Sequence, residues 1–278
     1  MEKMEFDVIV GNPPYQGNHA GDGEGRNKLL WPSFVERGLE ITANDGYLCL
    51  VHPSLWRKPE HKIWDLLTKN NMEFLSIHSD QEGDKIFGAT TRFDWYICQK
   101  ASNRGKCLVR DQSKYETKLD LQKLSFLPNW NLQKFLKIMT EKNGVDVIYG
   151  TAHHNQSEHV RKIKSDEFCY PVIHSITAKG PVTYWTKNKT VGSFGRKKVI
   201  VNTGRILYAI NDFNGSCGMT EGCFGIPVTS ESEASKIVSA ITSEKFQNDI
   251  IKPSKWSNFR IDYRMFKYFR KDFWKDFI

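Results

Sequence analysis

The hydrophobic pattern of residues 1–118 alternates between two periods. Short runs rich in β-branched and aromatic residues predict strands, and apolar residues at helical spacing predict helices between them. The predicted strands are Phe6–Gly11, Tyr47–His52, Glu73–His78 and Phe93–Cys98, and the predicted helices span about 28–42 and 60–70. This alternation is typical of a doubly wound α/β sheet. The continuous apolar run of the first strand predicts that it is buried within the sheet.

The polar stretches of the same region are expected to be irregular. We expect a loop at 80–85 and a polar connection at 100–118 that leaves the sheet. A glycine-rich stretch at 16–27 contains Gly21-x-Gly23-x-Gly25, but it lacks the strand and βαβ frame of a nucleotide-binding loop. We therefore predict that it is a mobile loop bordering the active site.

The pattern changes in the second half of the chain. Leucine-rich spacing at 119–150, interrupted by Pro128, predicts helices that connect two domains. We predict short strands at 172–177, 182–185, 198–202 and 206–210, separated by turns, and then a helix at 230–243. These elements predict a smaller α+β domain beyond residue 151. The predicted domains are thus a partial doubly wound (Rossmann-like) sheet at 1–118, a helical connector at 119–150 and a basic domain at 151–278.

Charge distinguishes the two halves. The 278-residue chain has a net charge of +8, and residues 151–278 hold the whole excess, with 20 Lys and Arg against 12 Asp and Glu. A basic region rich in aromatic residues favours contact with phosphate backbones. The alternative is a generic basic surface. The cations that we expect to contact DNA are Arg196, Lys197, Lys198, Lys255, Arg260 and Arg264.

The first predicted strand runs directly into Asn12-Pro13-Pro14-Tyr15. The prolines make a stiff turn at the carboxyl end of the strand, which is the edge where open α/β sheets bind ligands. The Asn12 side-chain carbonyl and a neighbouring backbone carbonyl can accept both hydrogens of an exocyclic amine. Tyr15 offers a face on which a planar ring can stack. This arrangement indicates an amine methylation site.

The stretch from Asp7 to Tyr15 resembles motif IV of the S-adenosylmethionine-dependent N6-adenine DNA methyltransferases, the TaqI-like group of restriction-modification enzymes. The same tetrapeptide occurs in protein-glutamine and some RNA methyltransferases. Residues 45–53 and 86–100 also resemble this family. The latter region implies an aromatic residue against the target base, for which Phe87 and Phe93 are candidates; the alternative for either ring is a role in the core. The second half resembles target-recognition regions more loosely. The resemblance implies S-adenosylmethionine as cofactor and double-stranded DNA as partner.

The family normally places its cofactor-binding half before motif IV, and we find no such half in this sequence. We therefore expect a restriction-modification methylase subunit or fragment that needs a second chain to supply the cofactor site. The alternative is a non-catalytic DNA-binding or restriction-blocking protein derived from a methyltransferase.

The remaining motifs exclude other classes. Six cysteines are scattered without a C-x-x-C pair, which predicts reduced thiols. His153, His154 and His159 lack a partner at ligand spacing, so we expect no metal site and imidazoles that face solvent or DNA. No run of about 18 apolar residues and no signal peptide is seen, and we expect a cytoplasmic protein without a membrane span.

Overall fold

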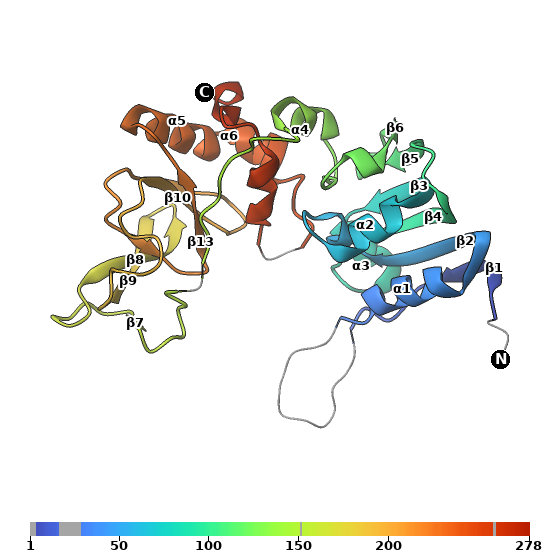
Figure 1. Ribbon diagram of the computed structural model, residues 1–278, viewed down its shortest axis with the longest axis horizontal. Helices are drawn as coiled ribbons and strands as arrows, with labels where there is room; N and C mark the ends of the chain where they lie inside the picture. Colours follow the sequence, from blue (N-terminus) through green and yellow to red (C-terminus); the bar gives the residue numbers. More distant parts are fainter. Residues whose placement is uncertain (1–3, 17–28, 151, 258–259) are drawn as a thin grey trace. The chain divides into compact units, whose positions relative to one another are not determined.

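The structure, a computed structural model, describes residues 4–16, 29–150, 152–257 and 260–278. It forms two compact units, Met1–Trp130 and Asn131–Ile278 (Figure 1). The division falls inside the predicted connector 119–150, which is therefore shared between the units, and the second unit contains more residues than the first. Residues 17–27 of the predicted glycine-rich loop lie outside the described residues.

The first unit is built on a six-stranded mixed sheet with the order β1-β2-β4-β3-β5-β6. β1 runs parallel to β2, whereas β4 is antiparallel to both β2 and β3. β5 and β6 form an antiparallel hairpin where we predicted a polar connection, and this hairpin extends the sheet beyond β3. The strands are β1 (Phe6–Gly11), β2 (Thr42–Pro53), β3 (Asn70–His78), β4 (Phe93–Ser102), β5 (Cys107–Arg110) and β6 (Glu116–Leu119).

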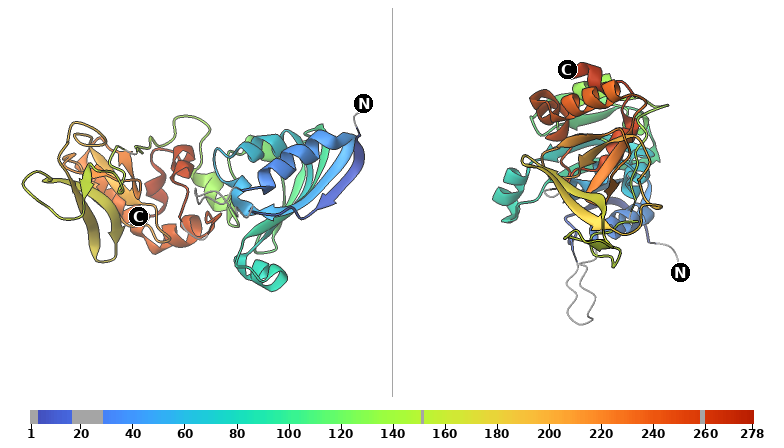
Figure 2. Two further views of the ribbon diagram at one scale, coloured as in Figure 1. Left: turned by 90° about the horizontal axis from the view of Figure 1, so that it is seen from below. Right: turned by 90° about the vertical axis from the view of Figure 1, so that its left-hand side faces the viewer.

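The helices α1 (Trp31–Ile41) and α2 (Lys62–Thr68) contact each other and cover one face of this sheet (Figure 2). Residues on the covered face, such as Leu48 and Leu75, are fully buried. The opposite face carries apolar side chains that are only half-buried, among them Val51 and Trp95, which are paired across β2 and β4. Short 3-10 turns at Ser54–Arg57 and Leu121–Lys123 complete the unit.

The segment predicted as a loop at 80–85 is instead the helix α3 (Asp80–Phe87). A capping box starts it: the Ser79 Oγ accepts from the Glu82 backbone N–H at 3.1 Å, and the Glu82 carboxylate accepts from the Ser79 N–H at 2.9 Å. Gly88, with a φ of 64°, ends it in the left-handed region. Gly83 is required by close packing, since a Cβ there would lie 2.0 Å from the Thr91 carbonyl oxygen.

β1 differs from the prediction of a buried strand. It pairs only with β2 among the described strands, and it forms one edge of the sheet. Its apolar side chains are exposed, with Phe6 at 43%, Val8 at 57% and Val10 at 76%. The β-branched run correctly predicted a strand, but burial depends on neighbours that the described part of this chain does not provide.

The second unit combines two small sheets with helices. A four-stranded sheet has the order β12-β8-β9-β7, and a three-stranded antiparallel sheet has the order β11-β10-β13. The strands are β7 (Val160–Arg161), β8 (Tyr170–Thr177), β9 (Gly180–Thr186), β10 (Lys198–Asn202), β11 (Ala209–Asp212), β12 (Gly218–Met219) and β13 (Cys223–Pro227). The strand predicted at 206–210 begins three residues later, and β12 and β13 were not predicted.

The helix α5 (Glu231–Thr242) packs against β10 and β11, and its N-cap is Ser230. A cluster of fully buried aromatic rings, including Phe246, Phe266 and Phe273, fills the space beside it. The other elements are α4 (Leu132–Ile138), α6 (Glu244–Phe246), a π-helical turn at Gln247–Ile251 and 3-10 turns at Tyr263–Tyr268 and Phe273–Asp276. None of the described helices is long and apolar enough to cross a membrane.

Candidate active site

The turn Asn12–Tyr15 follows β1 at the carboxyl edge of the first unit's sheet, beside the end of β2. Pro13 is buried, whereas Asn12 and Pro14 are exposed. The Tyr15 carbonyl accepts from the Leu30 N–H at 3.2 Å, which ties the turn to the residue before α1. The exposed Asn12 amide is therefore held on a turn that is fixed at both ends.

Three aromatic side chains meet next to this turn. Tyr15 lies edge-to-face with Phe87, with ring centroids 6.5 Å apart, and Phe87 lies edge-to-face with Phe93 at 5.0 Å. Phe93 is 3% exposed and is stacked on His78 at 4.5 Å, whereas Phe87 is 37% exposed. Phe87 thus contacts Tyr15, and Phe93 contacts Phe87 from within the core. Of these two predicted candidates, the Phe87 ring is the one that is exposed to a ligand.

The Tyr15 hydroxyl is buried and has no hydrogen-bond partner among the described residues. Burial, reinforced by the charge of Asp94, raises the pKa of Tyr15 to about 12. The phenol therefore stays protonated at neutral pH, and what Tyr15 contributes at the site is its ring.

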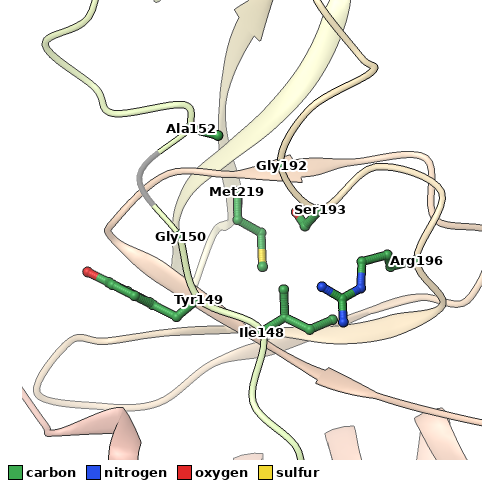
Figure 3. A pocket seen from close by; sticks show the side chains of 8 residues that line it. All are labelled: Ile148, Tyr149, Gly150, Ala152, Gly192, Ser193, Arg196 and Met219. Carbon is green, nitrogen blue, oxygen red and sulfur yellow. The ribbon is translucent and has the colours of Figure 1, made fainter.

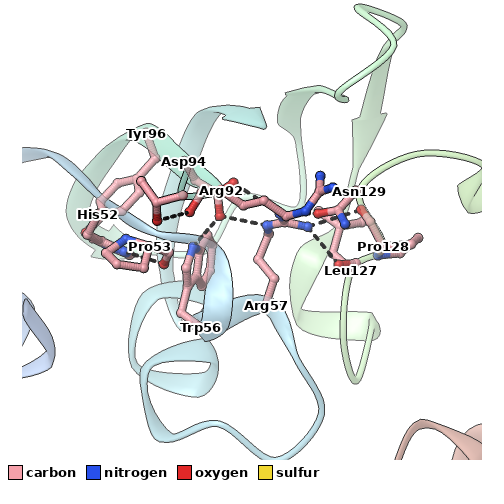
Figure 4. A network of polar contacts seen from close by, with 11 residues as sticks. His52, Pro53, Trp56, Arg57, Arg92, Asp94, Tyr96, Leu127, Pro128 and Asn129 are labelled. Atoms are coloured by element: carbon pink, nitrogen blue, oxygen red, sulfur yellow. Dashed lines mark hydrogen bonds and ion pairs between the residues drawn. The ribbon is translucent and has the colours of Figure 1, made fainter. Parts of the chain in front are cut away.

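A buried polar network lies at the start of β4 (Figure 4), and its member Asp94 is the carboxylate whose charge acts on Tyr15. Asp94 and Arg57 are both fully buried and form a bidentate pair, with Nε–Oδ2 at 2.7 Å and Nη2–Oδ1 at 3.1 Å. The Trp56 Nε1 also donates to Asp94, at 2.7 Å. The remaining guanidinium hydrogens are directed at the Leu127 and Pro128 carbonyls and the Asn129 side chain. Arg57 therefore links residues 127–129, near the end of the first unit, to the start of β4.

His52, at the end of β2, was not identified from the sequence. Its ring is stacked on Trp31 at 4.6 Å, and its Nε2 lies 3.3 Å from the Tyr96 hydroxyl. Burial lowers the pKa of His52 to about 3, so the ring is neutral. In the sequence, His52 stands at the end of an apolar strand and before a proline. This pattern fits a core histidine and a catalytic histidine equally well.

The predicted DNA-contacting cations all belong to the second unit, but their surroundings differ. Arg196, Lys197 and Arg260 are exposed. The prediction for Lys198 is wrong, because this side chain is fully buried and its Nζ forms an ion pair with Asp212 at 2.5 Å. Arg264 is 24% exposed and is paired bidentately with Asp262, and Lys255 is half-buried.

The histidine cluster also differs from the prediction in one member. His153 is 1% exposed, and its Nε2 donates to the Asn188 carbonyl at 3.2 Å, so it is not a solvent-facing imidazole. His159 is exposed. No group of three or more His, Cys, Asp or Glu side chains that could hold a metal ion occurs among the residues that the structure describes.

Comparison with known proteins shows which family the first part of the chain is similar to. Residues 1–87 match the Eco57I restriction-modification methylase family. Over 129 residues, 40% of this chain, the sequence is 30% identical to an uncharacterized adenine-specific methylase of Mycoplasma pneumoniae. The matching region covers 30% of that relative's length.

The fold has relatives among solved structures. The chain is similar to the Type IIL restriction-modification enzyme MmeI, solved in complex with DNA, with a TM-score of 0.50 and 8% identity over 94% of this chain and 45% of that one. It also aligns with the Type ISP restriction-modification enzyme LlaGI, with a TM-score of 0.48 and 11% identity over 96% of this chain and 34% of that one. Residues 1–87 are thus similar to restriction-modification methylases in sequence, and the whole chain resembles MmeI in fold.

Proposed function

We propose that this chain supplies the acceptor-binding and DNA-contacting parts of an S-adenosylmethionine-dependent enzyme that methylates adenine N6 in duplex DNA. The observation that carries this proposal is the turn at the end of β1, where an exposed Asn12 stands beside the ring pair Tyr15 and Phe87. The family match of residues 1–87, which include this turn, supports a restriction-modification role.

The proposed mechanism uses the acceptors and rings of this site. The Asn12 side-chain carbonyl and a backbone carbonyl of the turn accept the two hydrogens of the adenine amine. This grip directs the nitrogen lone pair out of the plane of the ring. The target base, taken out of the duplex stack, packs on Tyr15 and against the exposed Phe87. When bound, S-adenosylmethionine supplies an electrophilic methyl group for that nitrogen.

The cofactor requires surfaces beyond those that we assign to this chain. The apolar residues of β1 stand exposed at the sheet edge, and the face opposite α1 and α2 is half-exposed. An open apolar edge strand favours pairing with a further strand, and a large apolar patch marks an interaction surface. We propose that a cofactor-binding half covers both surfaces and that a second chain supplies it.

The second unit is assigned to DNA. Arg196, Lys197 and Arg260 are exposed cations in a unit with a positive net charge, and such side chains provide sequence-independent affinity for phosphates. Arg264 and Lys255 are retained as candidates of lower accessibility. Lys198 is not proposed as a contact, because its ammonium is buried.

The test compares variants of the acceptor site in the assembly that methylates DNA. Tyr15→Phe should retain most of the activity, because stacking requires the ring and the hydroxyl is buried without a partner. Tyr15→Ala should lose about 5- to 150-fold in rate, since stacking contributes roughly 1–3 kcal/mol per base. Asn12→Ala should lose at least about tenfold, because it removes an acceptor for the target amine. The measurement is methyl transfer from radiolabelled cofactor to duplex DNA.

Tyr115→Ala is the matched control, because this tyrosine of the same unit is 66% exposed and forms no part of the site. Equal losses for Phe and Ala at position 15 would remove the stacking role. DNA binding without methyl transfer in any assembly would favour a non-catalytic, restriction-blocking protein.

A further inference from the structure

A pocket of about 120 Å³ lies in the second unit, between the segment before β10 and the segment after α4 (Figure 3). The Arg196 guanidinium points into it from one side, and Ser193 lines the same side. The Ile148 and Met219 side chains form an apolar floor. A concave apolar surface with a few convergent polar groups is the usual form of a small-ligand site.

Two polar groups of this pocket have no hydrogen-bond or ion-pair partner among the residues that the structure describes. Ser193 is 4% exposed, and its Oγ forms no hydrogen bond with any described residue. The Arg196 guanidinium likewise forms no ion pair or hydrogen bond with another residue that the structure describes. A buried hydroxyl without a partner costs free energy. A ligand that accepts hydrogen bonds would satisfy both groups.

The buried Lys198 holds these two residues in position. Its Nζ donates to the Ser193 carbonyl at 2.9 Å and to the Arg196 carbonyl at 3.3 Å, while its charge is balanced by Asp212. The floor is equally fixed, because Ile148 and Gly225 exchange two backbone hydrogen bonds of 2.8 Å. The pocket is therefore preorganised, and binding requires little ordering of the backbone.

We propose that this pocket binds an oxyanion of the phosphate type. The planar guanidinium of Arg196 offers two parallel donors to phosphate oxygens, and the Ser193 hydroxyl offers a third. The apolar floor excludes water and so strengthens these charge-assisted bonds. The phosphate can belong to the DNA backbone or to a free phosphate-bearing molecule. The proposal that the pocket binds phosphate rests on the geometry of the pocket. Only the assignment of that phosphate to the DNA backbone rests on the proposed function.

In the experiment, inorganic phosphate is titrated into the full chain at constant ionic strength, and its binding is measured by calorimetry. Arg196→Gln should weaken binding by more than tenfold, and Ser193→Ala by roughly tenfold, the usual effect of losing a hydrogen bond to a charged group. Arg196→Lys should recover only part of the affinity, because an ammonium lacks the planar fork. Thermal melting of each variant verifies that the fold is retained.

Lys189→Gln is the matched control. It removes the same charge from the same segment between β9 and β10, at an exposed side chain that does not line the pocket and whose Nζ lies 5.0 Å from the Tyr170 ring centroid, and it should change phosphate affinity less than twofold. Equal effects of the variants at positions 196 and 189 would indicate diffuse attraction and overturn the proposal. The absence of phosphate binding to the unmodified chain would overturn it as well.

A second arm identifies the source of the phosphate. If the pocket holds a DNA phosphate, duplex DNA should displace inorganic phosphate, and Arg196→Gln should weaken DNA binding far more than Lys189→Gln. If DNA binds while phosphate stays bound, the pocket takes a free phosphate-bearing molecule. Phosphate binding by a chain that shows no affinity for DNA would retain the pocket and count against the proposed function.

Discussion

The side chain of Arg57 has a hydrogen-bond acceptor for each of its five N–H groups: two on Asp94, one on Asn129 and two backbone carbonyls. Such complete satisfaction is what makes a fully buried charge tolerable. Because the network joins β4 to residues 127–129, it stabilises the carboxyl edge of the sheet, where Tyr15 lies. This pairing could not be predicted from the sequence, since the partners lie 37 and about 70 positions apart.

Arg57→Met should therefore lower the free energy of unfolding by about 3–5 kcal/mol, because it leaves the Asp94 carboxylate buried without its counter-charge. Urea unfolding of the full chain provides the measurement. Arg37→Met serves as the control, since the Arg37–Glu40 pair is exposed at 65% and 53% and should contribute less than about 1 kcal/mol. Similar small losses for both variants would show that the buried network is not a major source of stability.

At the scale of elements, the apolar periodicity correctly predicted β1 to β4, α1, α2, β8 to β10 and α5. It failed where an element is polar. The strand β6 and the helix α3 bury no large apolar side chain, and β5 buries Cys107 and Val109 but is four residues long, so the hydrophobic signal of each element is weak. For α3 a second signal was present in Ser79-x-x-Glu82, the capping-box pattern. The polar composition of residues 80–85 suggested a loop, and Gly83 within this stretch is required by packing against Thr91.

The helix α3 ends with Phe87, so its capping should influence the acceptor site from a distance. Ser79→Ala removes the N-cap and should destabilise α3 by about 1 kcal/mol. We expect faster amide hydrogen exchange within α3 and lower methylation, although residue 79 does not line the site. Ser230→Ala, which removes the N-cap of α5 in the second unit, is the matched control. Unchanged exchange in α3 would contradict this role of the capping box.

The same capping box predicts that the stability of α3 depends on pH. Burial alone would raise the pKa of Glu82, but the Lys114 ammonium and the Ser79 N–H lower this pKa from 4.5 to about 2. A carboxylate whose pKa is lower in the folded state contributes stability above its unfolded pKa. The protection of α3 should therefore be complete above pH 4.5 and should decline as the pH falls toward 2.

At the scale of the whole molecule, composition predicted a division between an α/β part and a basic part, and the structure forms two units. Accessibility could not be predicted in the same way. Lys198 and His153 are buried because residues distant in sequence, Asp212 and Asn188, supply their partners. β1 has the composition of a central strand and stands at an edge. The sequence thus predicts local structure better than it predicts what surrounds each side chain.

The exposed edge of β1 also bears on how this chain binds its cofactor. In a doubly wound sheet the ligand crevice forms between loops from both halves, and we assign only the acceptor side of that crevice to this chain. Calorimetry on the isolated, monodisperse chain should therefore detect weak or no binding of S-adenosylmethionine, and activity should require the second chain.

Val10→Lys provides a sharper form of this test. This side chain of β1 is 76% exposed, so a lysine should be tolerated by the isolated chain, yet it would place a charge on the strand that we expect the second chain to cover. Assembly and methylation should be lost while the melting temperature of the isolated chain is unchanged. Val191→Lys, at a 43% exposed position of the second unit, should affect neither. Tight stoichiometric binding of S-adenosylmethionine by the chain alone, with methyl transfer to duplex DNA, would mean that this chain already contains a complete cofactor site.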